Sequence, residues 1–292
     1  MKIAIGIATS GRQETLARLF TYLSSLNVEL PNIFVCSPPK EDPVKTSTSL
    51  KLHWLTSVFK GTCCQRNTLI DAAHDVDFLF FMDDDFLIRG DYLKNLDLFL
   101  RNCPARPAVI TGTVISDGVT KGGLSFEQGI CLLKNASYKE FPPSVSPAFN
   151  GYGCNMAVNM NLVRKHGIRF DESLAMYGWM EDVEFSLQMK RFGEISKLGD
   201  CIGVHLGSPE GRLAARRLGY SQVANPYYIC QKHSLGRATF VRYFVFRTLK
   251  NFWYSFFYFN PIRYRRLQGN FLALIHLVTG KIDPRFVLDF QE

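Results

Sequence analysis

The chain has 292 residues, of which 47% are hydrophobic and 13% aromatic, so it can bury a full core, and a disordered protein is excluded. The net charge of +8 is uneven: residues 212–292 carry 13 Lys and Arg against 3 Asp and Glu, whereas residues 1–211 carry 21 against 23. The length predicts one large domain plus an appendage. The charge asymmetry predicts an anionic surface, either membrane or nucleic acid, as the partner of the basic tail alone.

Strand and helix patterns alternate over the first 115 residues. Short runs of β-branched, aromatic or other apolar residues predict strands at 3–8, 32–36, 52–55, 78–82 and 108–115. Apolar residues at helical spacing predict helices at 15–26, 65–73 and 92–100. Strands that alternate with helices predict an α/β fold with a mostly parallel central sheet and right-handed crossovers.

The pattern is weaker in the later part of the chain. We expect an edge strand at 130–133, a strand at 202–205, and helices at 160–166, 180–191, 240–259 and 270–278. The segment from 116 to 149 otherwise contains loop signals, among them Gly122-Gly123 and Pro142-Pro143.

Residues 77–85 are an apolar run that ends in three consecutive carboxylates, Asp83-Asp84-Asp85. Five large apolar residues in a row predict a fully buried strand, and ligands bind at the carboxyl ends of such strands in open α/β sheets. Two residues apart on extended backbone, Asp83 and Asp85 should project to the same side. Their oxygens suit Mg²⁺ or Mn²⁺. A solvated acidic turn or a helix N-cap is the alternative explanation.

A second acidic cluster, Glu181-Asp182-x-Glu184, follows Gly178 and Trp179 and opens a predicted helix. The helix N-terminus keeps a carboxylate ionised there, so that it could accept a proton from an attacking hydroxyl. Simple helix capping by acids explains the same pattern. His205, just after a predicted strand, is either a structural histidine or a ligand of Mn²⁺.

Together these residues resemble the inverting glycosyltransferases of family 2, which have the GT-A fold. The resemblance covers residues 1–207 and follows, in chain order, Thr9 and Arg12, Arg66-Asn67, Asp83-Asp84-Asp85, residues 155–164, Phe170-Asp171-Glu172, Glu181-Asp182-x-Glu184, Phe192-Gly193 and His205. It implies a catalytic domain at 1–207, with a nucleotide-sugar-binding half at 1–115 and an acceptor-binding half at 116–207. A basic, aromatic helical extension would follow at 208–292.

The resemblance also implies a donor and a metal. Asp85, with Asp83 and His205, would hold the Mn²⁺ or Mg²⁺ that bridges the diphosphate of a nucleotide diphosphate sugar, and we expect a UDP-sugar. Asp83 and Asp84 would contact ribose or the donor sugar. The remaining residues expected at the nucleotide-sugar site are Thr9, Arg12, Asp42, Arg66 and Asn67.

The same resemblance assigns the chemistry to the second acidic cluster. Asp182 would deprotonate an acceptor hydroxyl as it attacks the anomeric carbon in a single displacement, and Glu181 would orient the acceptor or the donor sugar. The acceptor would be a glycan or a lipid-linked molecule. Two positions depart from the family: the second strand lacks its usual terminal Asp, for which Asp42 is the substitute, and Gln188 replaces an Arg.

Residues 240–259 are dense in aromatic side chains and are interrupted by Arg242, Arg247 and Lys250. This composition predicts a helix that lies at the bilayer interface, and a helix packed on the catalytic domain is the alternative. A nucleic-acid partner is not expected, because no recognition motif accompanies the basic residues.

Compartment and alternative functions follow from the rest of the sequence. The sequence has eight cysteines without metal-type spacing, no signal peptide and no run of ~18–20 uncharged apolar residues. These features predict a cytoplasmic protein. If it binds the membrane, we expect it to be peripheral on the inner face. One alternative is a sugar-phosphate nucleotidyltransferase. Such an enzyme is expected to carry a glycine-rich loop with Lys or Arg after the first strand, and Thr9-Ser10-Gly11-Arg12 matches that loop only in part. The other is a non-catalytic sugar- or lipid-binding protein on the same fold.

Overall fold

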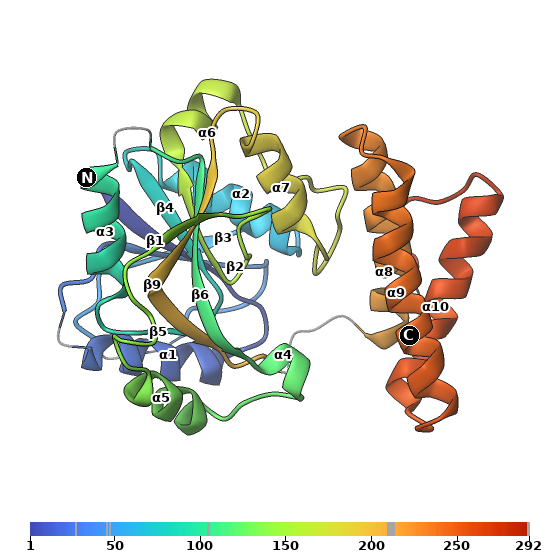
Figure 1. The fold of residues 1–292 in the computed structure, drawn as a ribbon, viewed down its shortest axis with the longest axis horizontal. Coiled ribbons are helices and arrows are strands. Elements are labelled where there is room, and N and C mark those ends of the chain that lie inside the picture. Colours follow the sequence, from blue (N-terminus) through green and yellow to red (C-terminus); the bar gives the residue numbers. More distant parts are fainter. Residues whose placement is uncertain (27, 45, 47, 104–105, 209–213, 291–292) are drawn as a thin grey trace. The chain divides into compact units, whose positions relative to one another are not determined.

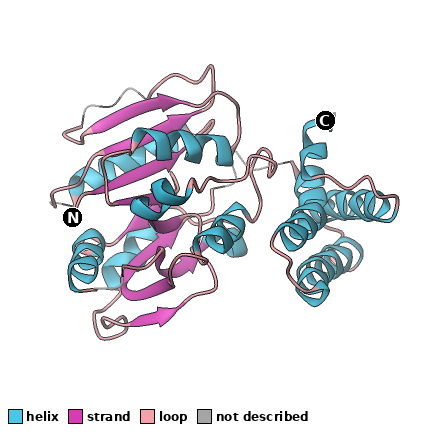
Figure 2. Ribbon diagram, turned by 90° about the horizontal axis from the view of Figure 1, so that it is seen from above, coloured by secondary structure: helices cyan, strands magenta, loops and turns pink. Residues whose placement is uncertain are grey.

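The computed structural model describes residues 1–292 except 27, 45, 47, 104–105, 209–213 and 291–292. The chain forms two compact units. The first comprises Met1–Lys60, Cys64–Phe170 and Phe185–Gly211, and the second comprises Gly61–Cys63, Asp171–Glu184 and Arg212–Glu292. Figure 2 shows strands and helices in the first unit and a group of helices in the second.

The first unit is built on one mixed sheet. Its strands are Ile3–Ala8 (β1), Ile33–Ser37 (β2), Leu52–Thr56 (β3), Phe78–Met82 (β4), Phe86–Ile88 (β5), Val109–Asp117 (β6), Val145–Pro147 (β7), Asn155–Asn159 (β8) and Ile195–His205 (β9). The strand order is β3-β2-β1-β4-β8-β6-β9-β5, and β7 pairs with β9 (Figure 1). Strands β3, β2, β1 and β4 pair in parallel, and β8 is antiparallel to β4 and β6. The structure therefore has the α/β fold with a central sheet that the sequence predicts.

Helices cover both faces of this sheet. Up to residue 189 they are Gln13–Ser25 (α1), Thr62–Ala72 (α2), Tyr92–Asn102 (α3), Gly118–Lys121 (α4), Phe126–Asn135 (α5), Met160–His166 (α6) and Glu181–Met189 (α7). All five residues of β4 are buried. Phe78, Phe80 and Met82 share one core with α1, α3 and α5, whereas Phe81 meets Phe170 on the opposite face. Burial on both faces explains why β4 is a continuous apolar run.

Residues 130–133, predicted as an edge strand, lie inside α5, so that prediction is wrong. Ser125 and Gln128 form a reciprocal capping box, in which each side chain accepts a hydrogen bond from the backbone N–H of the other, and this starts the helix. A four-residue apolar run is too short to distinguish a strand from a helix by its pattern. Strands β5, β7 and β8 were not predicted, and β9 is longer than the predicted strand at 202–205.

The second unit contains Ala215–Lys232 (α8), Arg237–Phe256 (α9), Pro261–Val278 (α10) and the 3₁₀ helix Pro284–Leu288 (η1). Its helices pack on one another around a buried core of Tyr220, Val223, Ala224, Ala273, Val287 and Phe290. The segment Asp171–Glu184 belongs to this unit, and its Ala175 and Met176 pack against the same core. Within the described ranges, none of the helices combines the length and apolarity needed to cross a bilayer.

Candidate active site

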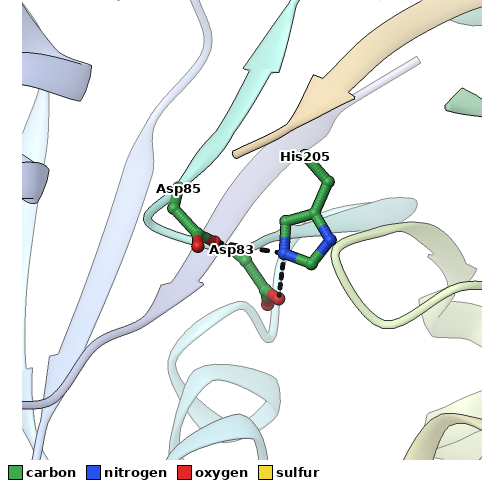
Figure 3. A group of neighbouring side chains, drawn as sticks. All are labelled: Asp83, Asp85 and His205. Atoms are coloured by element: carbon green, nitrogen blue, oxygen red, sulfur yellow. Dashed lines mark ion pairs between the residues drawn. The ribbon is translucent and has the colours of Figure 1, made fainter. Parts of the chain in front are cut away.

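A tight turn presents the three carboxylates at the carboxyl end of β4. Strand β4 ends at Met82 and β5 begins at Phe86, whose backbone N–H donates to the carbonyl of Asp83 at 3.1 Å. Asp83 and Asp85 therefore do not lie on an extended strand, and the alternation expected from the sequence does not apply. The turn itself directs both carboxylates toward His205 at the end of β9 (Figure 3).

Asp83, Asp85 and His205 form a group that could hold a metal ion, with ligand atoms within 4.8 Å of one another. Nε2 of His205 lies 3.3 Å from Oδ1 of Asp85 and 3.9 Å from Oδ2 of Asp83 (Figure 3). Oδ1 of Asp85 is buried, and apart from the nearby Nε2 of His205 it has no hydrogen-bond partner in the described part of the chain. Two carboxylates and one imidazole are a donor set that fits Mn²⁺ and leaves coordination positions for phosphate oxygens. The structure thus brings the three predicted metal-binding residues together.

Asp117, at the end of β6, holds the other side of the His205 ring. Oδ1 of Asp117 lies 3.1 Å from Nδ1 of His205, and the hydroxyl of Tyr152 donates to Oδ2 of Asp117 at 3.0 Å. An acceptor-only carboxylate at Nδ1 favours the tautomer that carries its proton there, which leaves Nε2 able to bind a metal. Asp117 was not predicted to belong to the site.

Burial and charge act in opposite directions on these groups. Burial by itself lowers the pKa of His205, but Cys154 and hydrogen bonds to Asp117 and Asp85 outweigh it, so the pKa is raised well above its ordinary value. Burial raises the pKa of Asp85, but the hydrogen bond and charge of His205 and the charge of Arg12 give a net lowering. The site therefore attracts positive charge, which is the electrostatic requirement of a cation site.

Asp84 turns away from this group into the protein. Its Oδ2 accepts a hydrogen bond from the hydroxyl of Thr9 at 2.6 Å, and its Oδ1 accepts one from Nη1 of Arg12 at 2.7 Å. Only 3% of its side chain is exposed. Thr9, Arg12 and Asp84, all predicted to contact the donor, are thus brought together by the structure and bind one another, which ties the loop after β1 to the acidic turn.

Arg66 orients Asp83 from α2. Its Nη2 lies 3.2 Å from Oδ1 of Asp83 and donates to the carbonyl of Gly153 at 2.9 Å. The guanidinium is buried between the rings of Phe81 and Phe170. These contacts place a fixed positive charge beside the predicted metal ligands.

Two other predicted donor-site residues lie outside this group. The side chain of Asn67 donates to the carbonyl of Phe170 and accepts from its N–H, both at 2.9 Å, so it fixes the backbone there. Asp42 is exposed. Its neighbour Glu41 instead binds the loop after β1, accepting from the hydroxyl of Ser10 at 2.9 Å and from the N–H of Gly11 at 2.8 Å.

Glu181 and Asp182 occupy the first turn of α7 and belong to the second unit. Oδ1 of Asp182 accepts a hydrogen bond from the N–H of Val183 at 2.8 Å, and the Asp182 side chain is partly exposed, whereas Glu181 is buried. The expectation that these acids open a helix is confirmed.

Comparison with known proteins identifies the type of fold. No protein-family model and no curated protein matches the chain. The structure is similar to "TarS 1-349 in complex with UDP-GlcNAc" from S. aureus, with a TM-score of 0.52 at 13% identity over 96% of this chain and 93% of that one. The fold is of the GT-A type.

Two further TarS crystal structures are also similar. TarS 1-349 without a named ligand matches with a TM-score of 0.51 at 15% identity, over 96% of this chain and 92% of the other. A longer TarS structure matches 88% of this chain at 17% identity and a TM-score of 0.50, and the present chain spans 44% of its length. At these identities the likeness is one of fold, and function has to be argued from the site.

Proposed function

We propose that this protein is a metal-dependent, inverting glycosyltransferase that moves a sugar from a nucleotide diphosphate sugar to a hydroxyl of a glycan or lipid-linked acceptor. The observation that carries the proposal is the group formed by Asp83 and Asp85, just after β4, and His205, at the end of β9, in a sheet of GT-A type. TarS, to which the fold is similar, was crystallised with UDP-GlcNAc and with UDP. A UDP-sugar is therefore the donor we propose.

The proposed reaction is a single displacement. Asp83, Asp85 and His205 would hold a divalent cation, which would supply Lewis-acid stabilisation of the diphosphate leaving group. The carboxylate of Asp182 takes the proton of the acceptor hydroxyl, whose oxygen forms a bond to the anomeric carbon while the bond from that carbon to the diphosphate oxygen breaks. Glu181 orients the acceptor or the donor sugar, and the nucleoside diphosphate leaves with inversion at the anomeric carbon.

The residues proposed for the donor site act partly through one another. Arg12 and Thr9 hold Asp84, and Arg66 holds Asp83, so these side chains set the shape and charge of the acidic turn. We place Asn67 and the segment around Asp42 at the border of the same nucleotide-sugar site. A preorganised set of charges of this kind stabilises a leaving group at little reorganisation cost.

Two matched substitutions test the proposal. UDP-sugars are screened for Mn²⁺-dependent thermal stabilisation and for UDP release with a saccharide or lipid-linked acceptor. Asp85→Asn should abolish the Mn²⁺-dependent stabilisation by UDP. Asp182→Asn should retain that stabilisation and reduce transfer by ~10²–10⁴-fold, the usual contribution of general-base catalysis. Unchanged transfer by Asp182→Asn rules out its role as the base.

Product analysis separates the alternative functions. A nucleotidyltransferase joins a nucleoside triphosphate to a sugar phosphate and releases pyrophosphate, whereas the proposed enzyme releases a nucleoside diphosphate. A non-catalytic binder releases neither. Pyrophosphate release or the absence of any turnover with a bound UDP-sugar contradicts the transferase.

We also propose that the second unit binds the anionic inner surface of the cytoplasmic membrane. Support comes from large apolar side chains that are at least half exposed on α9, α10 and the loop between them, namely Phe246, Leu249, Trp253, Phe256, Phe257, Tyr258, Phe259, Ile262, Phe271, Ile275 and Val278. Arg242, Arg247 and Arg265 are exposed on the same helices, and residues 211–282 contain no acid. Aromatic and basic side chains together suit the headgroup region of an anionic bilayer, and a lipid-linked acceptor lies at such a surface.

A further inference from the structure

A lysine of α8 joins the two ends of the segment Asp171–Glu184, which carries Asp182. Nζ of Lys232 lies 2.6 Å from Oδ2 of Asp171 and 2.7 Å from Oε1 of Glu184. The first and last residues of the segment therefore share one ammonium group. All of these residues belong to the second unit.

Two neighbours of Lys232 strengthen this junction. The hydroxyl of Tyr228 donates to Oδ2 of Asp171 at 2.7 Å, and Nε2 of His233 lies 2.9 Å from Oε1 of Glu184. The side chain of Glu184 is fully buried, and that of His233 is 4% exposed. A carboxylate removed from water is stable only when it is paired and hydrogen-bonded. Lys232 and His233, at the C-terminal end of α8, thus supply partners that compensate the burial of Glu184.

A third contact lies in the middle of the segment. Nδ2 of Asn225, also on α8, donates to the carbonyl of Trp179 at 2.8 Å. On either side of Trp179 the backbone is left-handed, with φ of 61° at Gly178 and 72° at Met180. A left-handed conformation at a residue such as Met costs on the order of 1 kcal/mol and persists only where the surroundings hold it. The turn directly before Glu181 and Asp182 is therefore held by a side chain of α8.

From these contacts we infer that Lys232 and Asn225 are positioning residues for Asp182, so that the helical extension is part of the catalytic apparatus. The inference rests on the proposed function, in which Asp182 is the general base. Asp182 lies between the turn that Asn225 fixes and the Glu184 that Lys232 holds. Displacement of a catalytic group by about 1 Å can reduce the rate by ~10²-fold, so a loose segment would impair catalysis without affecting the binding of nucleotide.

The electrostatics agree with a permanent junction. Burial opposes the ionised form of Asp171, but hydrogen bonds from Lys232 and Tyr228 outweigh it and lower the pKa to about 2. Burial also opposes the charged form of Lys232, which by itself would lower its pKa. The hydrogen bonds of Lys232 to Asp171 and Glu184 outweigh burial and raise the pKa. Asp171 and Lys232 therefore stay charged and paired throughout the neutral pH range.

The test compares Lys232→Met, Lys232→Arg and Asn225→Ala in the full chain, with Lys281→Met as the matched control at an exposed lysine of the same unit. We expect Lys232→Met to lower kcat by ~10–100-fold with unchanged KM for the UDP-sugar and unchanged UDP affinity. Lys232→Arg should recover most of kcat, since it restores a cation. Asn225→Ala should lower kcat by a smaller factor, and Lys281→Met should have no effect.

Hydrogen exchange supplies a readout that does not depend on turnover. In Lys232→Met, amides of the segment 171–184 should exchange faster while those of 78–88 are unchanged. If Lys232→Met unfolds the second unit, the positioning role is tested with Asn225→Ala and Lys232→Arg instead, by kcat and by hydrogen exchange of the segment 171–184.

The failure of this inference is distinct from the failure of the proposed function. If Asp182→Asn abolishes transfer while Lys232→Met and Asn225→Ala, both folded, keep the full kcat, the positioning role is wrong and the base assignment stands. If Asp182→Asn transfers normally, the proposed function itself fails.

Discussion

Asp117 and His205 stand opposite each other in the register of β6 and β9, with Oδ1 of Asp117 3.1 Å from Nδ1 of His205. The two strands are parallel at this point, so both residues lie at the same edge of the sheet as the acidic turn. This pairing gives the imidazole a fixed orientation and a defined tautomer, which is the usual arrangement around a metal-binding histidine.

The first prediction concerns this pair. Asp117→Asn should weaken Mn²⁺ binding by ~10–100-fold, because the amide no longer stabilises the Nδ1–H tautomer as a carboxylate does. Free Mn²⁺ measured by electron paramagnetic resonance during a titration gives the affinity directly. Asp75→Asn, at an exposed acid of the same unit, is the matched control. An Asp117→Asn variant with wild-type Mn²⁺ affinity would show that the contact between Asp117 and His205 has only a structural role.

The second prediction concerns the buried contact between Thr9 and Asp84. Thr9→Val keeps the shape but removes the hydroxyl that donates to Asp84 at 2.6 Å. We expect a loss of ~1–3 kcal/mol in the free energy of unfolding, the cost of leaving a buried acceptor with one partner fewer. Urea denaturation measures this loss. Thr21→Val, at an exposed threonine of α1, should change stability by less than ~0.5 kcal/mol; equal effects of both variants would contradict the role of Asp84 as an anchor.

The third prediction is a pH dependence. The pKa of Asp171 is lowered to about 2 in the folded protein, whereas an unperturbed Asp has a pKa of about 3.9. Between these values the unfolded chain binds more protons, so stability rises with pH there. The contribution of Asp171 is therefore complete above about pH 4 and is lost as the pH falls from about 4 to 2. The difference in Tm between wild type and Asp171→Asn should shrink over this window; a constant difference would refute the assignment.

The fourth prediction concerns the exposed aromatic and basic face of the second unit. Trp253→Ser with Phe257→Ser should reduce flotation with anionic vesicles by at least ~10-fold, because two half-exposed rings no longer insert. Arg242→Gln with Arg265→Gln should weaken binding by a similar factor, at ~1 kcal/mol per charge, and should reduce its salt dependence. The control is Phe59→Ser, at an aromatic residue of the first unit that is even more exposed. Full-length protein that does not float with anionic vesicles contradicts the membrane proposal.

The acidic strand was predictable because local pattern determines it. Five consecutive apolar residues can only be buried on both faces, and acids at the carboxyl end of such a strand point to a ligand site. Strand β8 escaped prediction because only three apolar residues lie between Asn155 and Asn159 at its two ends. In the fold the side-chain oxygen of Asn155 accepts hydrogen bonds from the N–H of Gly112 at 3.0 Å and from the hydroxyl of Tyr92, and no local pattern reveals these contacts.

The members of the site that were missed depend on contacts distant in sequence. Asp117 looks like a polar residue after a β-branched strand, and only the pairing of β6 with β9 brings it to His205. A signal was nevertheless present, because a carboxylate at the end of a predicted strand belongs to the same sheet edge as the acidic turn. The role of Lys232 could not be predicted, because α8 was not recognised and its contacts with Asp171 and Glu184 depend on how the second unit folds.

The discontinuous make-up of the second unit also sets the order in which the enzyme can mature on the ribosome. Glu184 is synthesised about 50 residues before Lys232, and nascent domains fold as their segments emerge, at about 5–20 residues per second. The central sheet can therefore assemble while the segment that carries Asp182 still lacks its partners from α8. A chain released by premature termination after His205 would contain every proposed metal ligand and nevertheless leave the proposed base unanchored.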